Sequence, residues 1–195
     1  MKRILATTLL ASGLCTGSVL ADWTLDPGRS HLTFISIKAK DVAEVHTFKE
    51  MSGSVSDDGQ VSVSMMLDSV ETLVPIRNER MREFLFETTD YKEAVLVAKI
   101  DPAIISGMEV GEITTINAEG NLTLHGQVQQ MTLLLQTAKV ADNAVMVAAA
   151  KPLVIDAAKF GMSEGVEKLR EIAGLASISN AVPVTFVMTF VDAAN

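Results

Sequence analysis

The sequence predicts a mainly β fold, an antiparallel barrel or sandwich, from three observations. Roughly eight strand-like segments follow one another at intervals of about ten residues, which is typical of all-β domains. Turn signals such as Asp26-Pro27-Gly28 and Asp57-Asp58-Gly59 separate neighbouring segments. Two segments show helical periodicity, too few for the alternating strands and helices of a parallel sheet.

Most of the strand-like segments alternate between the two sides of a strand, as a sheet with one buried face requires. In the last segment, for example, Val182, Val184 and Phe186 would share one side. The polar residues 40–46 are expected to form a loop. The expected strands lie, in chain order, within residues 23–38, 48–55, 61–67, 94–100, 112–124, 131–140, 145–155 and 182–191.

The two segments with helical periodicity predict short helices. Pro75 suits the first turn of a helix, and Met81, Phe84 and Leu85 follow at the i, i+3, i+4 spacing of one apolar face. Residues 163–174 repeat apolar side chains on one face, and the glycine at their end suits a C-terminal cap.

Residues 1–21 are expected to be a cleaved secretory signal. Lys2 and Arg3 precede an apolar run that is too short to span a bilayer, and small residues stand at positions 19 and 21, before the expected cut. Residues 22–195 then form one domain, a common domain size. The signal predicts secretion to the periplasm.

Charge and cysteine usage exclude several classes of function. The formal net charge is −8, and it becomes −10 when residues 1–21 are removed, because they hold two basic residues and no acidic one. Such a field repels nucleic acid and anionic membrane surfaces, so no nucleic-acid partner is expected. The single cysteine lies in the signal, and the three histidines show no metal-ligand spacing, so neither a disulfide nor a metal site is predicted.

The stretch from Leu67 to Phe86 concentrates cationic and apolar side chains in an otherwise acidic protein. Arg77, Arg80 and Arg82 stand here beside several apolar residues. One interpretation is a site for a ligand with a polar head and an apolar body. The other is a short amphipathic helix that closes one end of the β structure.

Several strands carry apolar residues on both sides, as in residues 133–135 and 145–147. A sheet with one side in water would alternate more cleanly. Either helices pack outside the sheet or the sheet forms a barrel whose interior is also apolar. A barrel of about eight strands can leave room for one small ligand.

An enzyme is the alternative raised by residues 161–165, which match G-x-S-x-G between a strand and a helix, as in a nucleophile elbow. In that fold the histidine base follows the serine, whereas the last histidine here is His125. Ser163 is therefore expected to cap the helix, with Glu164 and Glu167 complementing the helix dipole. A secreted serine hydrolase using Ser163 remains the alternative.

The opening motif W-x-L-D-P-x-x-S-x-L-x-F resembles the YceI-like family of periplasmic lipid-binding proteins. The resemblance implies a lipocalin-like antiparallel eight-stranded barrel with a long apolar tunnel, in a family associated with polyisoprenoid chains, including isoprenoid quinones. Asn78 is a departure, because many members have aspartate there. The residues that carry the resemblance are 23–34, Ser69 and Thr72 with Arg77 and Met81, 120–126, Phe160-Gly161 and 182–184.

These observations lead to the hypothesis of a carrier for a long isoprenoid lipid, with that lipid as ligand and no other cofactor. Arg77 and Arg80 are predicted to contact its head group. A transient membrane encounter and a homodimer are compatible with this role, and a structural or stress-response protein with a filled core is the alternative. The residues predicted to line the tail are Phe34, Met66, Phe84, Phe86 and Phe186.

Overall fold

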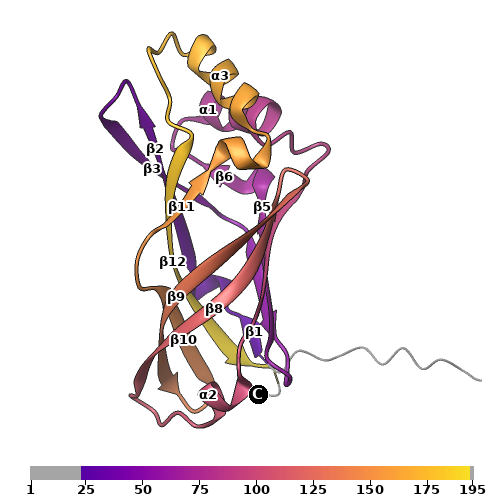
Figure 1. The fold of residues 1–195 in the computed structure, drawn as a ribbon, viewed down its shortest axis with the longest axis vertical. Coiled ribbons are helices and arrows are strands. Elements are labelled where there is room, and N and C mark those ends of the chain that lie inside the picture. Colours follow the sequence, from indigo (N-terminus) through magenta and orange to yellow (C-terminus); the bar gives the residue numbers. More distant parts are fainter. Residues whose placement is uncertain (1–22, 194–195) are drawn as a thin grey trace, which may run out of the picture.

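The computed structural model describes residues 23–193 of the 195-residue chain. The expected secretory signal lies outside this range. The described residues form an elongated barrel with helices at both ends (Figure 1). Helices α1 (Pro75–Arg80) and α3 (Ser163–Ile172) lie at one end, and α2 (Pro102–Ser106) lies at the other. None of the described helices is long and apolar enough to cross a membrane.

The described part of the chain contains one sheet of 12 strands, and every strand pair in it is antiparallel. Its members are β1 (Trp23–Leu25), β2 (His31–Lys38), β3 (Val42–Phe48), β4 (Met51–Val55), β5 (Gln60–Met66), β6 (Val70–Glu71), β7 (Glu93–Lys99), β8 (Ile113–Leu124), β9 (Gln127–Ala141), β10 (Ala144–Ala149), β11 (Leu153–Asp156) and β12 (Ala181–Asp192).

Within residues 23–193, eight of these strands close into a ring in the order β1-β4-β5-β7-β8-β9-β10-β12. Antiparallel pairing of β1 with β12, from Trp23 opposite Asp192 to Leu25 opposite Phe190, completes the ring. The predicted antiparallel eight-stranded barrel is therefore confirmed. Closure removes the exposed strand edges that an open sheet would leave.

Strand β12 extends the barrel because its two halves have different neighbours. Its C-terminal half pairs with β10 and β1. Its N-terminal half pairs with β11 and β2, and β2 continues through β3 to β6. This extension carries the β-structure up to helices α1 and α3 (Figure 1).

Two local expectations were wrong, and one helix was not predicted. Residues 40–46 were expected to be a loop, but most of them belong to β3, whose polar residues Glu44 and His46 are inward and partnered. Residues 145–155 form two strands, with Pro152, which lacks an N–H group, in the break. Helix α2 was not expected. The Asp101 side chain caps it by accepting the Ala103 N–H at 3.0 Å, and Pro102 occupies its first position.

The arginine segment departs from a regular α-helix. After α1 the chain forms one π-helical turn, η3 (Met81–Leu85), in which the Phe86 N–H donates to the Met81 carbonyl at 2.9 Å. A π-turn closes its hydrogen bond over five residues instead of four, which shifts the following side chains around the helix. Met81 and Phe86 are buried and, together with Leu85, line the cavity, whereas Phe84 does not.

Candidate ligand-binding cavity

The barrel encloses a cavity of about 780 Å³ that runs from the α1 end to the α2 end. On β8 its wall is formed by alternate residues, from Ile116 through Ala118 and Leu122 to Leu124. These positions span about 27 Å along the strand, at about 3.4 Å per residue. Apolar side chains form most of the wall, so the cavity suits a long, narrow hydrocarbon.

The strands with apolar residues on both sides contribute alternate residues to this wall. Leu133 and Leu135 line the cavity, as do Val145 and Val147, whereas the residue between each pair does not. The choice left open by the sequence is thus settled for these strands in favour of an apolar barrel interior. A filled core, which the structural alternative requires, is not found in residues 23–193.

Three of the five residues predicted to line a lipid tail lie in the cavity wall. These are Phe34, Phe86 and Phe186, and all three are buried. Phe34 and Phe86 belong to an aromatic group at the α1 end, because Phe48 lies 5.2 Å from one ring and 5.6 Å from the other, measured between centroids. The three side chains thus lie in the cavity wall, and their contact with a lipid tail stays a prediction.

Met66 and Phe84 do not line the cavity, so their predicted position was wrong. On β5 the inward residues are Val63 and Met65, and strand alternation turns Met66 to the other side. Phe84 is displaced by the π-turn, and its carbonyl oxygen faces helix α3 at Gly165.

The end of the cavity next to α1 is polar and charged. Its lining includes Lys38, Glu44, His46, Arg77 and Arg80, from β2, β3 and α1. The two predicted head-group arginines are therefore brought to the same end of the cavity. Their environments differ, and this difference determines which of them can serve a ligand.

Arg77 is bound to the protein itself. Its Nη1 donates to Glu44 Oε2 and its Nη2 to the Thr72 carbonyl oxygen, both at 2.7 Å. Lys38 Nζ also contacts Glu44 Oε2 at 2.7 Å. The hydrogen bond from Lys38, followed by the charge of Arg77, lowers the pKa of Glu44 despite the cost of partial burial. Glu44 is thus a carboxylate that ties Arg77 in place.

The Arg80 side chain makes no hydrogen bond and no ion pair to any residue in the described range 23–193. It is half-buried and lies in the cavity wall. A guanidinium in this position can donate several hydrogen bonds to a phosphate or carbonyl oxygen. Arg80 is therefore the less restrained of the two cations, although the buried Nε of Arg77 also lacks a partner.

His46 adds an uncharged polar group to the same end. It is 3% exposed, and its Nε2 lies 2.8 Å from Ser36 Oγ. Its Nδ1 is buried without a partner. Burial, assisted by the charge of Arg77, lowers the pKa of His46, so the neutral imidazole dominates at neutral pH. Nδ1 therefore has an unused hydrogen-bonding position, either a donor or an acceptor depending on the tautomer.

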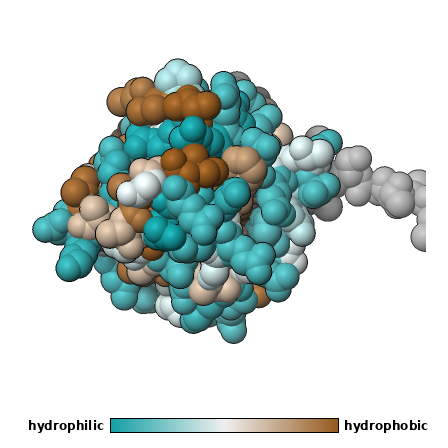
Figure 2. All heavy atoms as spheres, turned by 90° about the horizontal axis from the view of Figure 1, so that it is seen from above, coloured by the Kyte–Doolittle hydropathy of each residue, from teal (hydrophilic) through white to brown (hydrophobic). Residues whose placement is uncertain are grey.

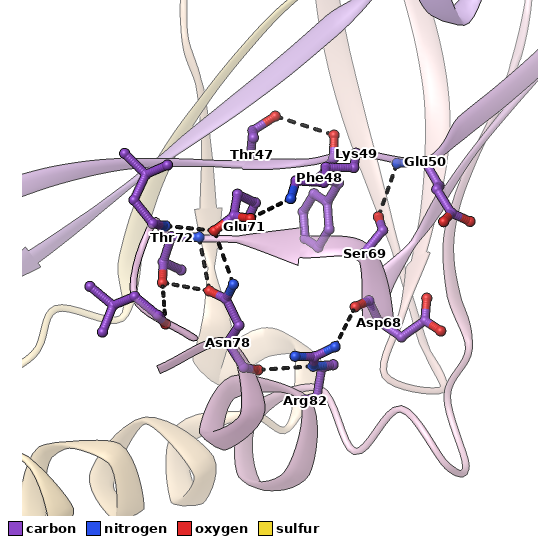
Figure 3. A network of polar contacts seen from close by, with 12 residues as sticks. Thr47, Phe48, Lys49, Glu50, Asp68, Ser69, Glu71, Thr72, Asn78 and Arg82 are labelled. Atoms are coloured by element: carbon purple, nitrogen blue, oxygen red, sulfur yellow. Dashed lines mark hydrogen bonds and ion pairs between the residues drawn. The ribbon is translucent and has the colours of Figure 1, made fainter. Parts of the chain in front are cut away.

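A polar network around Asn78 holds the α1 end in shape (Figure 3). Asn78 is buried, and its Oδ1 accepts the Thr72 N–H at 2.9 Å and the Thr72 hydroxyl at 2.5 Å. Its Nδ2 donates to Glu71 Oε1 at 3.0 Å, and Lys49 pairs with the other oxygen of Glu71. An asparagine suits this position because an aspartate could not donate to Glu71 and would repel it.

The other end of the cavity is lined differently. Trp23, Ile100, Pro102 and Ile105 contribute apolar surface there, and Asp57 is the charged residue among those that line this end of the cavity within residues 23–193. Both ends reach exposed residues, such as Ile76 in α1 and Pro102 in α2.

The G-x-S-x-G segment has a structural explanation. Gly161 has a φ of 70°, a left-handed conformation that ends the preceding 3₁₀ turn. A Cβ on Gly165 would lie 2.3 Å from the Phe84 carbonyl oxygen, so glycine lets α3 approach the π-turn. Met162 is the N-cap residue, so the expected capping by Ser163 was wrong by one position.

Ser163 also lacks the partner that a nucleophile needs. His46 bonds to Ser36 and His125 to Glu87, and within residues 23–193 no hydrogen bond joins Ser163 to a histidine. In the same range no group of three or more histidine, cysteine, aspartate or glutamate residues is placed to hold a metal ion.

A closed antiparallel barrel around an elongated apolar cavity with one polar end defines a lipid-binding class of protein. A family model described as the YceI-like domain matches residues 23–190, and the chain belongs to this family. A comparison with curated proteins found no match.

Two solved structures are similar to this chain. A polyisoprenoid binding domain from Saccharophagus degradans, implicated in plant cell wall breakdown, is 35% identical, with a TM-score of 0.87 over 89% of this chain and 99% of that one. BcnA from Burkholderia cenocepacia is 20% identical, with a TM-score of 0.66 over 85% of this chain and 98% of that one, and supports the fold alone.

Sequence reasoning missed His46 and Thr137 as cavity residues. Thr137 is fully buried in the wall, and its hydroxyl has no partner. The alternation of Glu44, His46 and Phe48 could have indicated the β3 strand, but polar residues at inward positions resemble a loop.

Proposed function

We propose that this protein is a periplasmic carrier for a long-chain isoprenoid lipid, either a polyprenyl compound or an isoprenoid quinone. The tail occupies the apolar length of the barrel, and the head lies at the α1 end beside Arg80 and His46. The protein performs no catalysis on its ligand in this role. The family membership and the similarity to a polyisoprenoid binding domain support the proposal.

The observation that carries the proposal is the shape and lining of the cavity. An apolar channel of about 27 Å along β8, at about 3.4 Å per residue, fits a chain better than a compact ring system. Burying each methylene contributes about 0.8 kcal/mol, and ordering a flexible tail offsets part of that sum. Tail length should therefore dominate affinity, and the polar end should select the head group.

A series of isoprenoid quinones with the same head and increasing tail length tests this function. We expect the thermal unfolding midpoint to rise with tail length, because a ligand that binds the folded state alone raises it, until the tail exceeds the cavity. A midpoint that does not depend on tail length would contradict the proposal.

Ester turnover provides the test of the enzymatic alternative. We expect the protein to hydrolyse acyl esters no faster than a Ser163→Ala variant does. Turnover that the Ser163→Ala substitution abolishes would show a catalytic serine and overturn the assignment of a binding role alone.

A further inference from the structure

Exposed apolar side chains gather beside the polar end of the cavity. Leu73, Val74 and Ile76 are all exposed, and Leu73 reaches 87%. Val45 of β3 is 62% exposed. Strands β3 and β6 pair with Thr47 opposite Glu71, so Val45 and Leu73 each lie two residues beyond the same pair. We call Val45, Leu73, Val74 and Ile76 the apolar rim; Figure 2 looks onto this end and shows apolar side chains exposed among polar ones.

The rim is held in place by bonded neighbours. Leu73 has a φ of 62°, a left-handed conformation that is costly for a leucine. Its N–H donates to Glu71 Oε1 at 2.6 Å, and the adjacent Thr72 is fixed by Asn78. The polar network thus holds a strained residue whose side chain contributes little to the core. Strain that persists in a well-bonded setting commonly serves a function.

The rim is continuous with the lining of the cavity. Val74 and Ile76 are exposed and at the same time line the cavity. Arg80 follows Ile76 by four residues and therefore lies about one helical turn away. Its charge is not neutralised by any residue in the range 23–193. An apolar surface with a free cation at its edge complements a lipid layer, where hydrocarbon lies beneath phosphate oxygens.

We propose that the apolar rim docks onto the surface of a phospholipid bilayer and that the lipid ligand enters the cavity between Val74 and Ile76. Leu73 and Val45 insert among the acyl chains, and Arg80 contacts a lipid phosphate. This inference rests on the proposed carrier function. The strong negative net charge favours a zwitterionic surface, which presents phosphates without a repelling field.

Flotation with phosphatidylcholine vesicles tests the docking, without any isoprenoid ligand present. We expect the protein to float with the vesicles and Leu73→Asp to reduce the bound fraction at least fivefold. Ile113→Asp is the matched control, because Ile113 is 64% exposed and begins β8, at the opposite end of the barrel. This control should float like the parent protein.

Ligand binding in detergent separates this proposal from the carrier function. Leu73→Asp should bind a detergent-solubilised isoprenoid quinone as the parent does, but should extract it from vesicles several-fold more slowly. If the parent protein does not bind the quinone in detergent, the carrier function is overturned. The flotation result then decides the docking proposal by itself.

Three outcomes would overturn the docking proposal. The first is an equal bound fraction for Leu73→Asp and the parent, and the second is an equal loss for Ile113→Asp. The third is dimerisation through the rim, seen in sedimentation as a dimer that Leu73→Asp converts to a monomer, since the rim would then be covered by a second copy.

A Leu73→Gly variant keeps the test valid if the aspartate substitution disturbs folding. It should raise the thermal unfolding midpoint, because glycine adopts a positive φ without strain, and it should still lower vesicle binding.

Discussion

The two ends of the cavity differ in charge, although the same strands connect them. At the α1 end the wall contains Arg77 and Arg80, with Lys38, Glu44 and His46 nearby. At the α2 end Asp57 is the charged residue among the described residues that line the cavity, and the rest of the wall there is apolar or weakly polar. We expect an anionic or oxygen-bearing head to prefer the end that contains the two arginines. The proposed ligand would then lie with its head at α1 and its tail towards α2.

Obstructing the middle of the cavity should have the largest effect. Ala118 is buried in the wall of β8, so Ala118→Phe places a ring across the path of the tail. Each methylene kept out removes up to about 0.8 kcal/mol, so we expect at least a tenfold loss of affinity for a long-tailed quinone. Titration of long-tailed and short-tailed quinones, followed by fluorescence, measures the loss.

The short-tailed compound and an outward variant are the controls. A ligand that fills only the α1 half should bind Ala118→Phe as it binds the parent. Asn117→Phe, on the exposed side of the same strand, should not affect either ligand. Equal losses for both ligands in Ala118→Phe would show that the tail does not run towards α2.

The second-largest effect should come from replacing Asn78, the central amide of the polar network, which should destabilise the α1 end. Asn78→Asp sets a carboxylate against Glu71 Oε1 and removes the Nδ2 donor. Asn78 is buried, so the carboxylate oxygen that replaces Nδ2 faces Glu71 as a buried acceptor without a donor, which costs about 1–3 kcal/mol, and the free energy of unfolding should fall by about that amount at pH 7. Urea denaturation measures it. Adding Glu71→Gln should restore part of the loss, and a single Asn78→Asp variant as stable as the parent would contradict the assigned network.

The two arginines of the α1 end should respond in opposite ways. Arg80→Ala should weaken binding of a polyprenyl phosphate about tenfold, because a charge-assisted hydrogen bond contributes about 1.5–3 kcal/mol, and should leave stability unchanged. Arg77→Ala should instead lower the free energy of unfolding by about 1–2 kcal/mol through the lost bonds to Glu44 and Thr72. Calorimetric titration and urea denaturation of both variants separate the effects, and a hydrocarbon without a head is the control ligand. Loss of phosphate binding in Arg77→Ala alone would reverse the assignment.

Acid should weaken the α1 end over a defined range of pH. The hydrogen bond from Lys49, followed by those from Asn78 and the Leu73 N–H, lowers the pKa of Glu71 from 4.5 to about 2. A carboxyl group whose pKa is lower in the folded protein stabilises the fold fully at pH values above the pKa that it has in the unfolded chain. Stability should therefore decline as the pH falls from about 4.5 towards about 2, and Glu71→Gln should make this decline shallower. Urea denaturation across the range is the measurement, and an identical slope in the variant would exclude Glu71 as a contributor.

Local sequence rules located the barrel and part of its interior. Alternation along a single strand is sufficient to place Phe34 and Phe186 inward, and turn signals separate the strands. The same rules failed for Phe84, because the change from an α-helical to a π-helical turn leaves no simple mark in the residues. They also failed for β3, where inward polar residues were taken as a loop.

The roles of the arginines could not be predicted because they depend on distant partners. Glu44 precedes Arg77 by 33 positions, and only the folded structure brings the two side chains together. Arg80 has the same residue type and almost the same neighbours in sequence, but it forms no ion pair with any residue of the described range 23–193. Pairing in three dimensions therefore decides which of two adjacent cations remains free for a ligand.

Native mass spectrometry of the protein purified from its own cell envelope, followed by organic extraction, tests the carrier function most directly. We expect an added mass that corresponds to a single isoprenoid lipid. The same lipid should be found in the extract, and Ala118→Phe should fail to retain it. A protein that carries no lipid when isolated, and takes none up from a mixture of isoprenoid quinones and polyprenyl phosphates, would contradict the carrier function.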